Sequence, residues 1–267
     1  MADVVTSRRN PQVMLLDSLL RQKKAREERG LFVLEGARLC QDAFEAGVIF
    51  ELVFATEQAL GRYPGLLAMS EGAGKTGKLI LIGEGLAERV ADTGSTQGVF
   101  AVCKAFSPPE FLPSWGKRYI LLSEIRDPGN LGAILRTAAA LGMDGAVISC
   151  CAELFSPRVL RASMGGIWRL PVYTFGDIMA PIALLKKAGV PVCAAALRDE
   201  AEGVGVLSGP EGAAILVGNE GAGLPRELIE SADRIVRIPM EKETESLGAA
   251  MAAGILMWET AREDRLS

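Results

Sequence analysis

Residues 127–142 read D-P-G-N-L-G-A-I-L-R-T-A-A-A-L-G and place an asparagine and an arginine at a glycine-rich junction between a strand and a helix. The apolar run 119–122 predicts the strand, and Asp-Pro-Gly after it predicts a turn, which leaves Asn130 at a helix N-cap position. Arg136 lies about 100° past Leu135 and off the apolar face. It is either a solvated helix arginine or part of a reaction site. The apolar residues at the spacing of one buried helix face are Leu131, Ile134, Leu135, Ala138 and Ala139.

Composition predicts a globular protein large enough for two domains, because the chain has 267 residues of which 49% are hydrophobic. No charge-free run has the length of a membrane span, and no apolar core of a signal peptide follows Arg8, so we expect a cytoplasmic protein with no membrane partner. The five cysteines form no C-x-x-C pair and the chain has no histidine, so we expect reduced thiols and no metal site. The absence of histidine also excludes Ser-His-Asp and Cys-His catalysis.

Charge is unevenly distributed along the chain. The net charge of -4 argues against nonspecific coating of nucleic acid, but residues 1–30 carry seven Lys and Arg against four Asp and Glu. A solvated helix explains this local excess as well as a phosphate-binding arm does.

The segment 107–115, S-P-P-E-F-L-P-S-W, holds three prolines and marks a domain boundary. We therefore expect a small α/β domain over 1–106, a linker over 107–116 and a second α/β domain over 117–267. The second domain should contain a mostly parallel sheet with helices on both faces, which binds ligands at the carboxyl ends of its strands. Strands are predicted at 32–34, 52–55, 79–82, 99–103, 119–122, 146–150, 172–175, 190–195, 214–217 and 235–238, and a helical stretch at 38–46.

The last helix is predicted to begin near Ser246 and to carry one apolar stripe. The stripe comprises Leu247, Ala250, Met251, Gly254, Ile255 and Trp258.

Two glycine-rich segments have different meanings. The first, 71–76 (E-G-A-G-K-T), resembles the end of a P-loop, but Met69 occupies the first glycine position and no strand precedes it, so we expect a surface loop. The second, 215–224 (I-L-V-G-N-E-G-A-G-L), follows a strand and precedes a helix signalled by Pro225. Its glycines would let the backbone approach a ligand, with the Glu220 carboxylate at the end of the strand. The alternative is a tight strand-helix turn.

Three segments together, D-P-G-N-L-G-A-I-L-R-T-A, L-V-G-N-E-G-A-G-L and I-P-M-E-K-E-T-E-S-L-G-A-A-M-A-A-G, resemble the signature motifs of SpoU-type (TrmH-like) RNA ribose 2′-O-methyltransferases of the SPOUT class. The stretch 156–172, S-P-R-V-L-R-A-S-M-G-G-I-W-R-L-P-V, is similar to the family's linking segment. F-V-L-E-G-A-R and A-D-T-G-S-T-Q-G-V-F-A-V are more loosely similar to the substrate-binding domain of members that act on ribosomal RNA.

The resemblance implies an α/β domain with a deep trefoil knot, in a homodimer that binds S-adenosylmethionine in the knot. The cofactor would be held by backbone groups around Leu197, Gly218, Ile238 and Leu247. The expected reaction is methyl transfer to a ribose 2′-hydroxyl of RNA, with ribosomal RNA favoured over transfer RNA as the partner.

The resemblance also makes Arg136 the main catalytic residue. A guanidinium stays protonated in proteins, so our hypothesis is that Arg136 binds the RNA phosphate and hydroxyl and stabilises a developing alkoxide. The phosphate or Glu220 would take the proton, and Asn130 would order the first motif and touch the ribose.

The third motif departs from the family pattern, because S-L-G-A-A (246–250) stands where S-L-N-V-S is usual. The side chains replaced by Gly248 and Ala250 are polar groups expected to order the cofactor loop. The chain is therefore either an active methyltransferase or a noncatalytic RNA-binding or ribosome-assembly protein, and a nucleotide-dependent enzyme that uses glycines 218–223 is a third alternative. We expect the basic segment 8–29 to contact RNA.

Overall fold

The structure, a computed structural model, describes residues 4–71, 78–241 and 247–266. It divides into two compact units, the first formed by Met1–Ser107 with Glu153–Gly165 and the second by Pro108–Ala152 with Gly166–Ser267. No helix in the described part of the chain is long and apolar enough to cross a membrane.

The first unit is built on a four-stranded sheet of order β1-β4-β2-β3. Strand β4 is antiparallel to β1 and to β2, and β3 is parallel to β2. Its strands are β1 (Leu31–Glu35), β2 (Phe50–Ala55), β3 (Lys78–Leu81) and β4 (Val99–Lys104), and its helices are α1 (Pro11–Arg21), α2 (Lys23–Arg29), α3 (Ala37–Glu45), α4 (Glu57–Arg62), α5 (Gly65–Glu71), α6 (Glu84–Val90) and α8 (Pro157–Ser163).

The segment Glu153–Gly165, which contains α8, belongs to this first unit although the sequence suggested one second domain over 117–267. Neighbouring strand residues face opposite sides of a sheet, so Val33 joins the core beneath α1 and α6, whereas Phe32 stacks on Phe155 with ring centroids 4.8 Å apart. The buried Arg26 guanidinium donates two hydrogen bonds of 2.5 Å to the Glu153 carboxylate. These contacts join residues more than a hundred positions apart, so no local pattern announces them.

The basic segment 8–29 is largely ion-paired within the first unit. Arg26 is buried against Glu153 and is therefore not available for RNA. Of the others, Arg8 and Arg21 pair with Asp17, and Lys23 and Lys24 pair with Glu27 and Glu28. RNA contact by this segment stays a prediction, and the structure leaves fewer of its charges free to make it.

The second unit contains a seven-stranded sheet of order β7-β6-β5-β10-β8-β11-β9 in which every pairing is parallel. Its strands are β5 (Arg118–Ser123), β6 (Gly145–Ser149), β7 (Val172–Phe175), β8 (Val192–Ala195), β9 (Glu202–Gly203), β10 (Ala213–Val217) and β11 (Arg234–Arg237). Its helices are α7 (Pro128–Ala140), α9 (Met179–Lys187), α10 (Arg226–Ser231) and α11 (Ala249–Leu266), with short 3-10 turns η1 (Gly166–Trp168) and η2 (Val204–Leu207).

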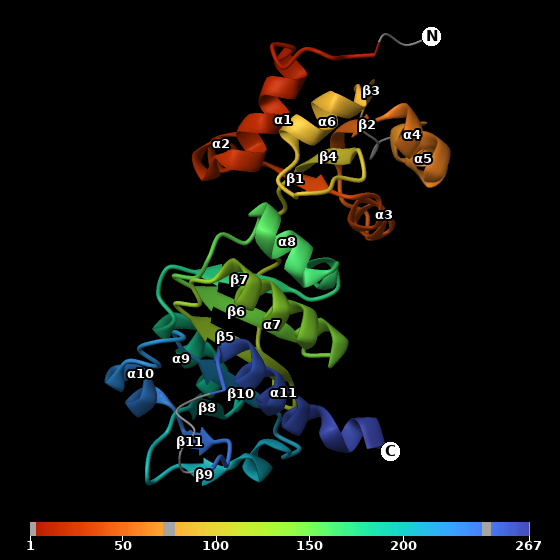
Figure 1. Ribbon diagram of the computed structural model, residues 1–267. Helices are drawn as coiled ribbons and strands as arrows, with labels where there is room; N and C mark the ends of the chain where they lie inside the picture. Colours follow the sequence, from red (N-terminus) through yellow and green to blue (C-terminus); the bar gives the residue numbers. More distant parts are fainter. Residues whose placement is uncertain (1–3, 72–77, 242–246, 267) are drawn as a thin grey trace. The chain divides into compact units, whose positions relative to one another are not determined.

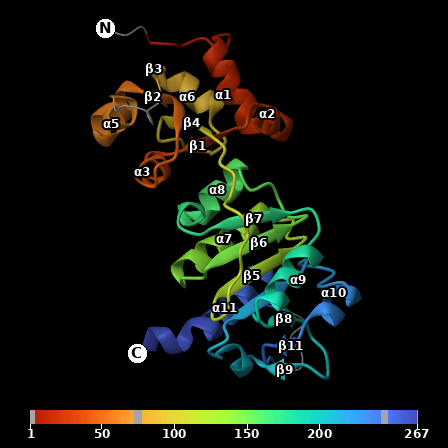
Figure 2. The same ribbon diagram turned by 180° about the vertical axis from the view of Figure 1, so that it is seen from behind.

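Helices cover both faces of this sheet. Helices α7 and α11 lie together on the face seen in Figure 1, and α9 and α10 lie on the face seen from behind in Figure 2. Alternate strand residues such as Tyr119 and Leu121 pack beneath α9 and α10. This confirms the predicted mostly parallel α/β architecture.

The proline-rich segment packs against the second unit rather than running free as a linker. Phe111 is buried in the core of that unit, with its ring 5.5 Å from Tyr119 and 4.8 Å from Tyr173. The prolines exclude regular structure, as expected, but the aromatic side chain between them anchors the segment.

The ten predicted strands are all present, and the two-residue strand β9 was not predicted. The prediction that Asn130 is the N-cap of α7 was wrong, because the Asp127 side chain accepts the N–H of Asn130 at 2.8 Å and Pro128 begins the helix. Both residue types cap helices, and Pro is favoured at the first helical position.

The predicted apolar stripe on the last helix is not the face of the helix that is buried within the second unit. Helix α11 begins at Ala249, and Ser246 lies outside the described residues. The buried residues of α11 are Ala249, Ala253, Leu256, Met257, Thr260 and Ala261. By contrast, Met251 and Trp258 from the predicted stripe remain 60% and 42% exposed.

Candidate active site

The site forms where the connections from two neighbouring parallel strands diverge. Strands β5 and β10 pair along their length, but the chain continues from β5 to β6 on one side and from β10 to β11, beyond β8, on the other. Such a switch point leaves a crevice at the carboxyl ends of the strands.

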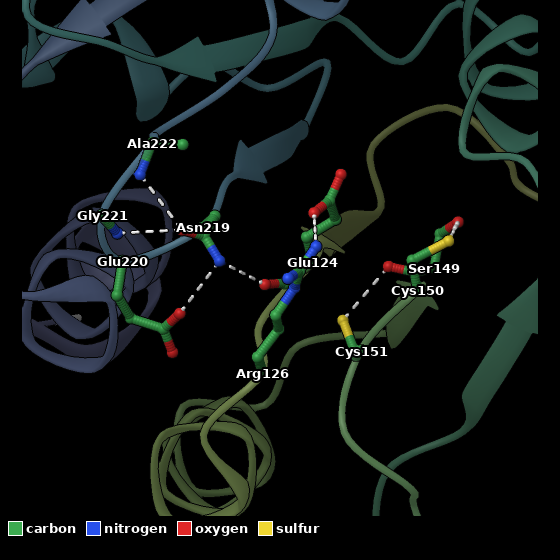
Figure 3. Close-up of polar contacts among 9 residues, drawn as sticks. All are labelled: Glu124, Arg126, Ser149, Cys150, Cys151, Asn219, Glu220, Gly221 and Ala222. Carbon is green, nitrogen blue, oxygen red and sulfur yellow. Dashed lines mark hydrogen bonds and ion pairs between the residues drawn. The ribbon is translucent and has the colours of Figure 1, made fainter.

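Asn219 ties the ends of these two strands together (Figure 3). Its Nδ2 donates to the carbonyl oxygen of Glu124 at 3.0 Å, and its Oδ1 accepts the backbone N–H groups of Gly221 and Ala222 at 2.9 and 3.0 Å. Glu124 is itself held at a positive φ of 59° and donates its N–H to the Ser149 carbonyl on β6. Sequence reasoning missed Asn219, although an asparagine two residues after a strand and before Glu-Gly is typical of a side chain that closes a turn.

Two of the three predicted catalytic residues meet in this crevice. The Asn130 Nδ2 on the first turn of α7 donates to Glu220 Oε1 at 3.0 Å, so residues 90 positions apart are joined. The Asn130 side chain therefore links the first motif to the second, and its predicted contact with the ribose stays a prediction.

The Glu220 carboxylate is held in its ionised form. Burial raises the pKa of Glu220, but hydrogen bonds from Asn130 and from the backbone, including the N–H groups of Asp127 and Arg126, outweigh burial and lower the pKa below its ordinary value of 4.5. A lowered pKa makes this carboxylate a weaker proton acceptor than an ordinary glutamate. The geometry favours an organising role for Glu220.

Gly218 is required by a close approach of backbone to backbone. A Cβ atom at this position would lie 2.5 Å from the Gly223 carbonyl oxygen and 2.7 Å from the Leu224 nitrogen. The loop 218–223 folds back on itself, with the Gly223 N–H donating to the Asn219 carbonyl at 2.9 Å. The segment therefore forms the tight turn that the sequence offered as one alternative, and its role in binding a ligand stays a prediction.

A cavity of about 690 Å³ opens beside this loop at the ends of β8, β10 and β11 and at the start of α11. The residues predicted to hold the cofactor, Leu197, Gly218, Ile238 and Leu247, all line it, as does Glu220. Leu197 and Leu247 are apolar yet 61% and 37% exposed, so they offer apolar surface to a ligand. Sequence reasoning missed two exposed cations in the same lining, Arg198 and Arg237.

Arg136 lies apart from the Asn130–Glu220 pair. It is exposed on α7, two turns beyond Asn130, and does not line the cavity. Its backbone is fixed by η1, because a Cβ on Gly166 would lie 2.8 Å from Arg136 Cα and 3.1 Å from the Leu135 carbonyl oxygen. The structure thus holds the backbone of Arg136 firmly and leaves its guanidinium open to solvent.

The altered third motif keeps a defined backbone shape. Gly248 adopts a φ of 74° directly before α11, and a Cβ there would meet no atom within 4 Å. Asparagine, the usual family residue, is among the non-glycine residues that best tolerate this conformation. Glycine in place of asparagine at position 248 therefore removes a side chain but leaves the backbone conformation unchanged. In the P-loop-like segment 71–76, residues 72–76 lie outside the described part of the chain, so the expected surface loop stays a prediction.

Family models match both halves of the chain. Residues 117–258 match the model of the SpoU rRNA Methylase family, and residues 10–101 match the MRM3-like substrate binding domain. The first match covers the sheet and the cavity, and the second covers most of the first unit.

Individual relatives agree with these matches over nearly the whole length. The 23S rRNA (guanosine(2553)-2′-O)-methyltransferase RlmP of Bacillus subtilis is 31% identical over 242 residues, which is 90% of this chain and 92% of the relative. The crystal structure of an rRNA methyltransferase from Sinorhizobium meliloti with bound AdoMet, which is S-adenosylmethionine, is 30% identical, with a TM-score of 0.85 over 98% of both chains. A crystal structure of an RNA 2′-O ribose methyltransferase is 28% identical, with a TM-score of 0.83 over 99% of this chain and all of that one.

The Asn130–Glu220 hydrogen bond predicts a measurable change in titration. Asn130→Ala should raise the pKa of Glu220 towards 4.5, as followed by carboxyl NMR during an acid titration. The folded pKa is depressed, so the ionised carboxylate stabilises the fold above pH 4.5, and this stabilisation is lost as the pH falls through the folded pKa. The control Thr137→Ala changes a side chain on the same helix that bonds only within it and should leave the titration of Glu220 unchanged. An unaltered Glu220 pKa in Asn130→Ala would contradict this assignment.

Proposed function

The chain belongs to the SpoU rRNA Methylase family, and from this membership we propose that it transfers a methyl group from S-adenosylmethionine to a ribose 2′-hydroxyl of RNA. Ribosomal RNA is the favoured substrate, because RlmP of Bacillus subtilis is named for 23S rRNA and the first unit matches a substrate-binding domain. The observation that carries the proposal is the cavity that unites Leu197, Gly218, Ile238 and Leu247.

The cavity fits S-adenosylmethionine in its chemistry. Its volume of about 690 Å³ suits a ligand of this size, and its wall combines apolar side chains with backbone that only glycine at 218 allows. Arg198 and Arg237 would favour the ligand's carboxylate. When bound there, S-adenosylmethionine supplies an electrophilic methyl group on a sulfonium.

Arg136 has the role of binding and orienting the RNA. Its guanidinium stays protonated and exposed, so its fork can hold the phosphate and the neighbouring ribose hydroxyl and stabilise negative charge that develops on the oxygen. Asn130 keeps the first turn of α7 in register with the second motif. Glu220 accepts the hydrogen bond that holds Asn130 in place. Because its pKa is lowered, we assign the proton of the ribose 2′-hydroxyl to the RNA phosphate instead of to Glu220.

No observation favours the noncatalytic alternative, which arose from the altered third motif. Gly248 preserves a chain path that asparagine also tolerates, and it lines the cavity together with Leu247 and Ala249. The proposal includes a cytoplasmic location, which is supported by five free cysteines.

The proposal also includes the trefoil knot and the homodimer. After β11 the chain returns to pack α11 against α7, β5 and β10, which is the path that a knotted C-terminal segment would need. Helix α11 presents Met251, Ile255 and Trp258 along its outer face, at spacings of four and seven residues. An apolar stripe of this kind next to the cavity-lining residues Ala252 and Leu256 fits burial against a second copy.

The role of Arg136 predicts a selective loss of turnover. Arg136→Ala and Arg136→Lys should both lower kcat for methyl transfer to ribosomal RNA, by about 100-fold or more for alanine, because a lysine cannot replace the fork. S-adenosylmethionine affinity by calorimetry should remain that of the wild type. The control Lys187→Ala removes an exposed cation from α9, on the other face of the sheet, and should keep full activity. Near-full turnover by Arg136→Lys would show that fork geometry is irrelevant.

The outer stripe of α11 predicts the oligomeric state. The wild type should be a dimer by light scattering, and Met251→Lys with Trp258→Ala should shift it towards the monomer, because a charge replaces apolar surface. The matched control is Leu184→Lys on α9, which changes an apolar residue of 41% exposure elsewhere in the second unit. A monomeric wild type, or the same effect from the control, would refute this interface.

A further inference from the structure

The first unit contains a second cavity, of about 330 Å³, that the proposed reaction does not use. It lies where β1 ends and turns into α3 through Gly36, whose φ is 107°. The loop after α6 contributes Thr93 and Ser95, and the α8 segment contributes Arg161 and Met164. This volume lies near the lower end of the ~300–1,000 Å³ range of small-ligand pockets.

Hydrogen bonds fix the walls of this β1–α3 cavity. The buried carboxylate of Glu35 accepts the Asp92 N–H at 3.1 Å and the Thr93 hydroxyl. Arg161 Nη2 donates to Asp92 at 2.6 Å, which joins the α8 segment to the same loop. The cavity is therefore preformed in the unit.

One donor in the wall is left without a hydrogen-bond partner. Arg161 Nη1 is buried and makes no hydrogen bond within the described residues, although the Glu35 carboxylate lies 3.8 Å away as an ion-pair partner. A buried donor without an acceptor is costly, and an acceptor atom on a ligand would satisfy it. The buried Arg161 Nη1 therefore favours a ligand that carries hydrogen-bond acceptor atoms.

The charges of the lining favour a neutral occupant. Arg38 and Arg161 are balanced by Glu35 and Asp42, so a phosphate would meet two carboxylates as well as two guanidiniums. A nucleobase is neutral and planar and presents acceptors and donors along its edges, which match the guanidinium and carboxylate groups. Leu39 and Met164 supply the apolar and polarisable contact that a ring face needs.

We propose that the β1–α3 cavity receives an unpaired base of the RNA substrate. The inference deepens the proposed function, since it takes the substrate to be RNA. RNA is read in sequence mainly through bases splayed out of single-stranded loops, and a neutral pocket with Arg and carboxylate edges accepts such a base. A base bound in this cavity would also give the first unit a contact with RNA that does not involve the Lys and Arg side chains of α1 and α2, most of which are ion-paired.

The test uses the full chain, a 23S ribosomal RNA transcript as the probe, and two matched arginine variants. Arg38→Ala removes an exposed cation from the cavity, and Arg89→Ala removes an exposed cation from α6 that does not line it. Arg38→Ala should raise KM and the anisotropy Kd for the RNA about tenfold, with kcat and S-adenosylmethionine affinity unchanged. Arg89→Ala should change either constant by about twofold at most.

The salt dependence of RNA binding separates a base contact from a phosphate contact. Loss of a base contact leaves the slope of log Kd against log salt as in the wild type, whereas loss of a phosphate contact reduces it by about one. A reduced slope for Arg38→Ala, or equal effects of the two variants, would overturn the proposal. RNA binding that depends on Arg38 without methyl transfer by the wild type would retain the cavity and reject the proposed activity.

A second measurement does not rely on a variant's activity. In protein labelled with methyl-13C methionine, the Met164 signal, assigned with Met164→Leu, should shift when the RNA transcript is added. Met164 is 42% exposed, so a bound base reaches it without rearrangement of the core. An unshifted Met164 signal at saturating RNA would overturn the proposal.

Discussion

The active site depends on one constraint, which is that β5 and β10 must end side by side although their loops belong to distant parts of the chain. Asn219 enforces this by donating to the Glu124 carbonyl on one strand end while closing the turn that follows the other. The Asn130–Glu220 hydrogen bond makes a second connection, between the start of α7 after β5 and the loop after β10. The loop 218–223 takes its shape from these bonds, and the cavity wall is built from that loop.

A second constraint acts through two consecutive glycines. A Cβ on Gly165 would lie 3.1 Å from the Asp42 carboxylate in the first unit, and a Cβ on Gly166 would press on the backbone of Arg136 in the second. Each glycine is therefore needed for a close approach within its own unit, Gly165 beside Asp42 and Gly166 beside Arg136.

Much of the architecture was predictable because buried parallel strands are short apolar runs bounded by turns, and such runs marked all ten predicted strands. The four residues expected to hold the cofactor came from the family resemblance, and the structure brings them to one cavity. The errors have physical causes. Asp127 and Asn130 both cap helices, and α11 is apolar on two faces, so periodicity alone could not select the buried one. The placement of Glu153–Gly165 rests on Phe32 and Arg26, which no local pattern connects to it.

The most direct measurement is calorimetric titration of S-adenosylmethionine into wild type, Gly218→Ala and Gly221→Ala. Both variants add one methyl group to the same loop, but a Cβ at 218 would strike the Gly223 backbone at 2.5 Å, whereas a Cβ at 221 meets Asn219 Oδ1 at an ordinary 3.6 Å. Wild type and Gly221→Ala should bind with similar micromolar affinity, and Gly218→Ala should bind far more weakly. Binding by Gly218→Ala equal to that of the wild type, or no binding by the wild type, would contradict the assignment of this cavity to the cofactor.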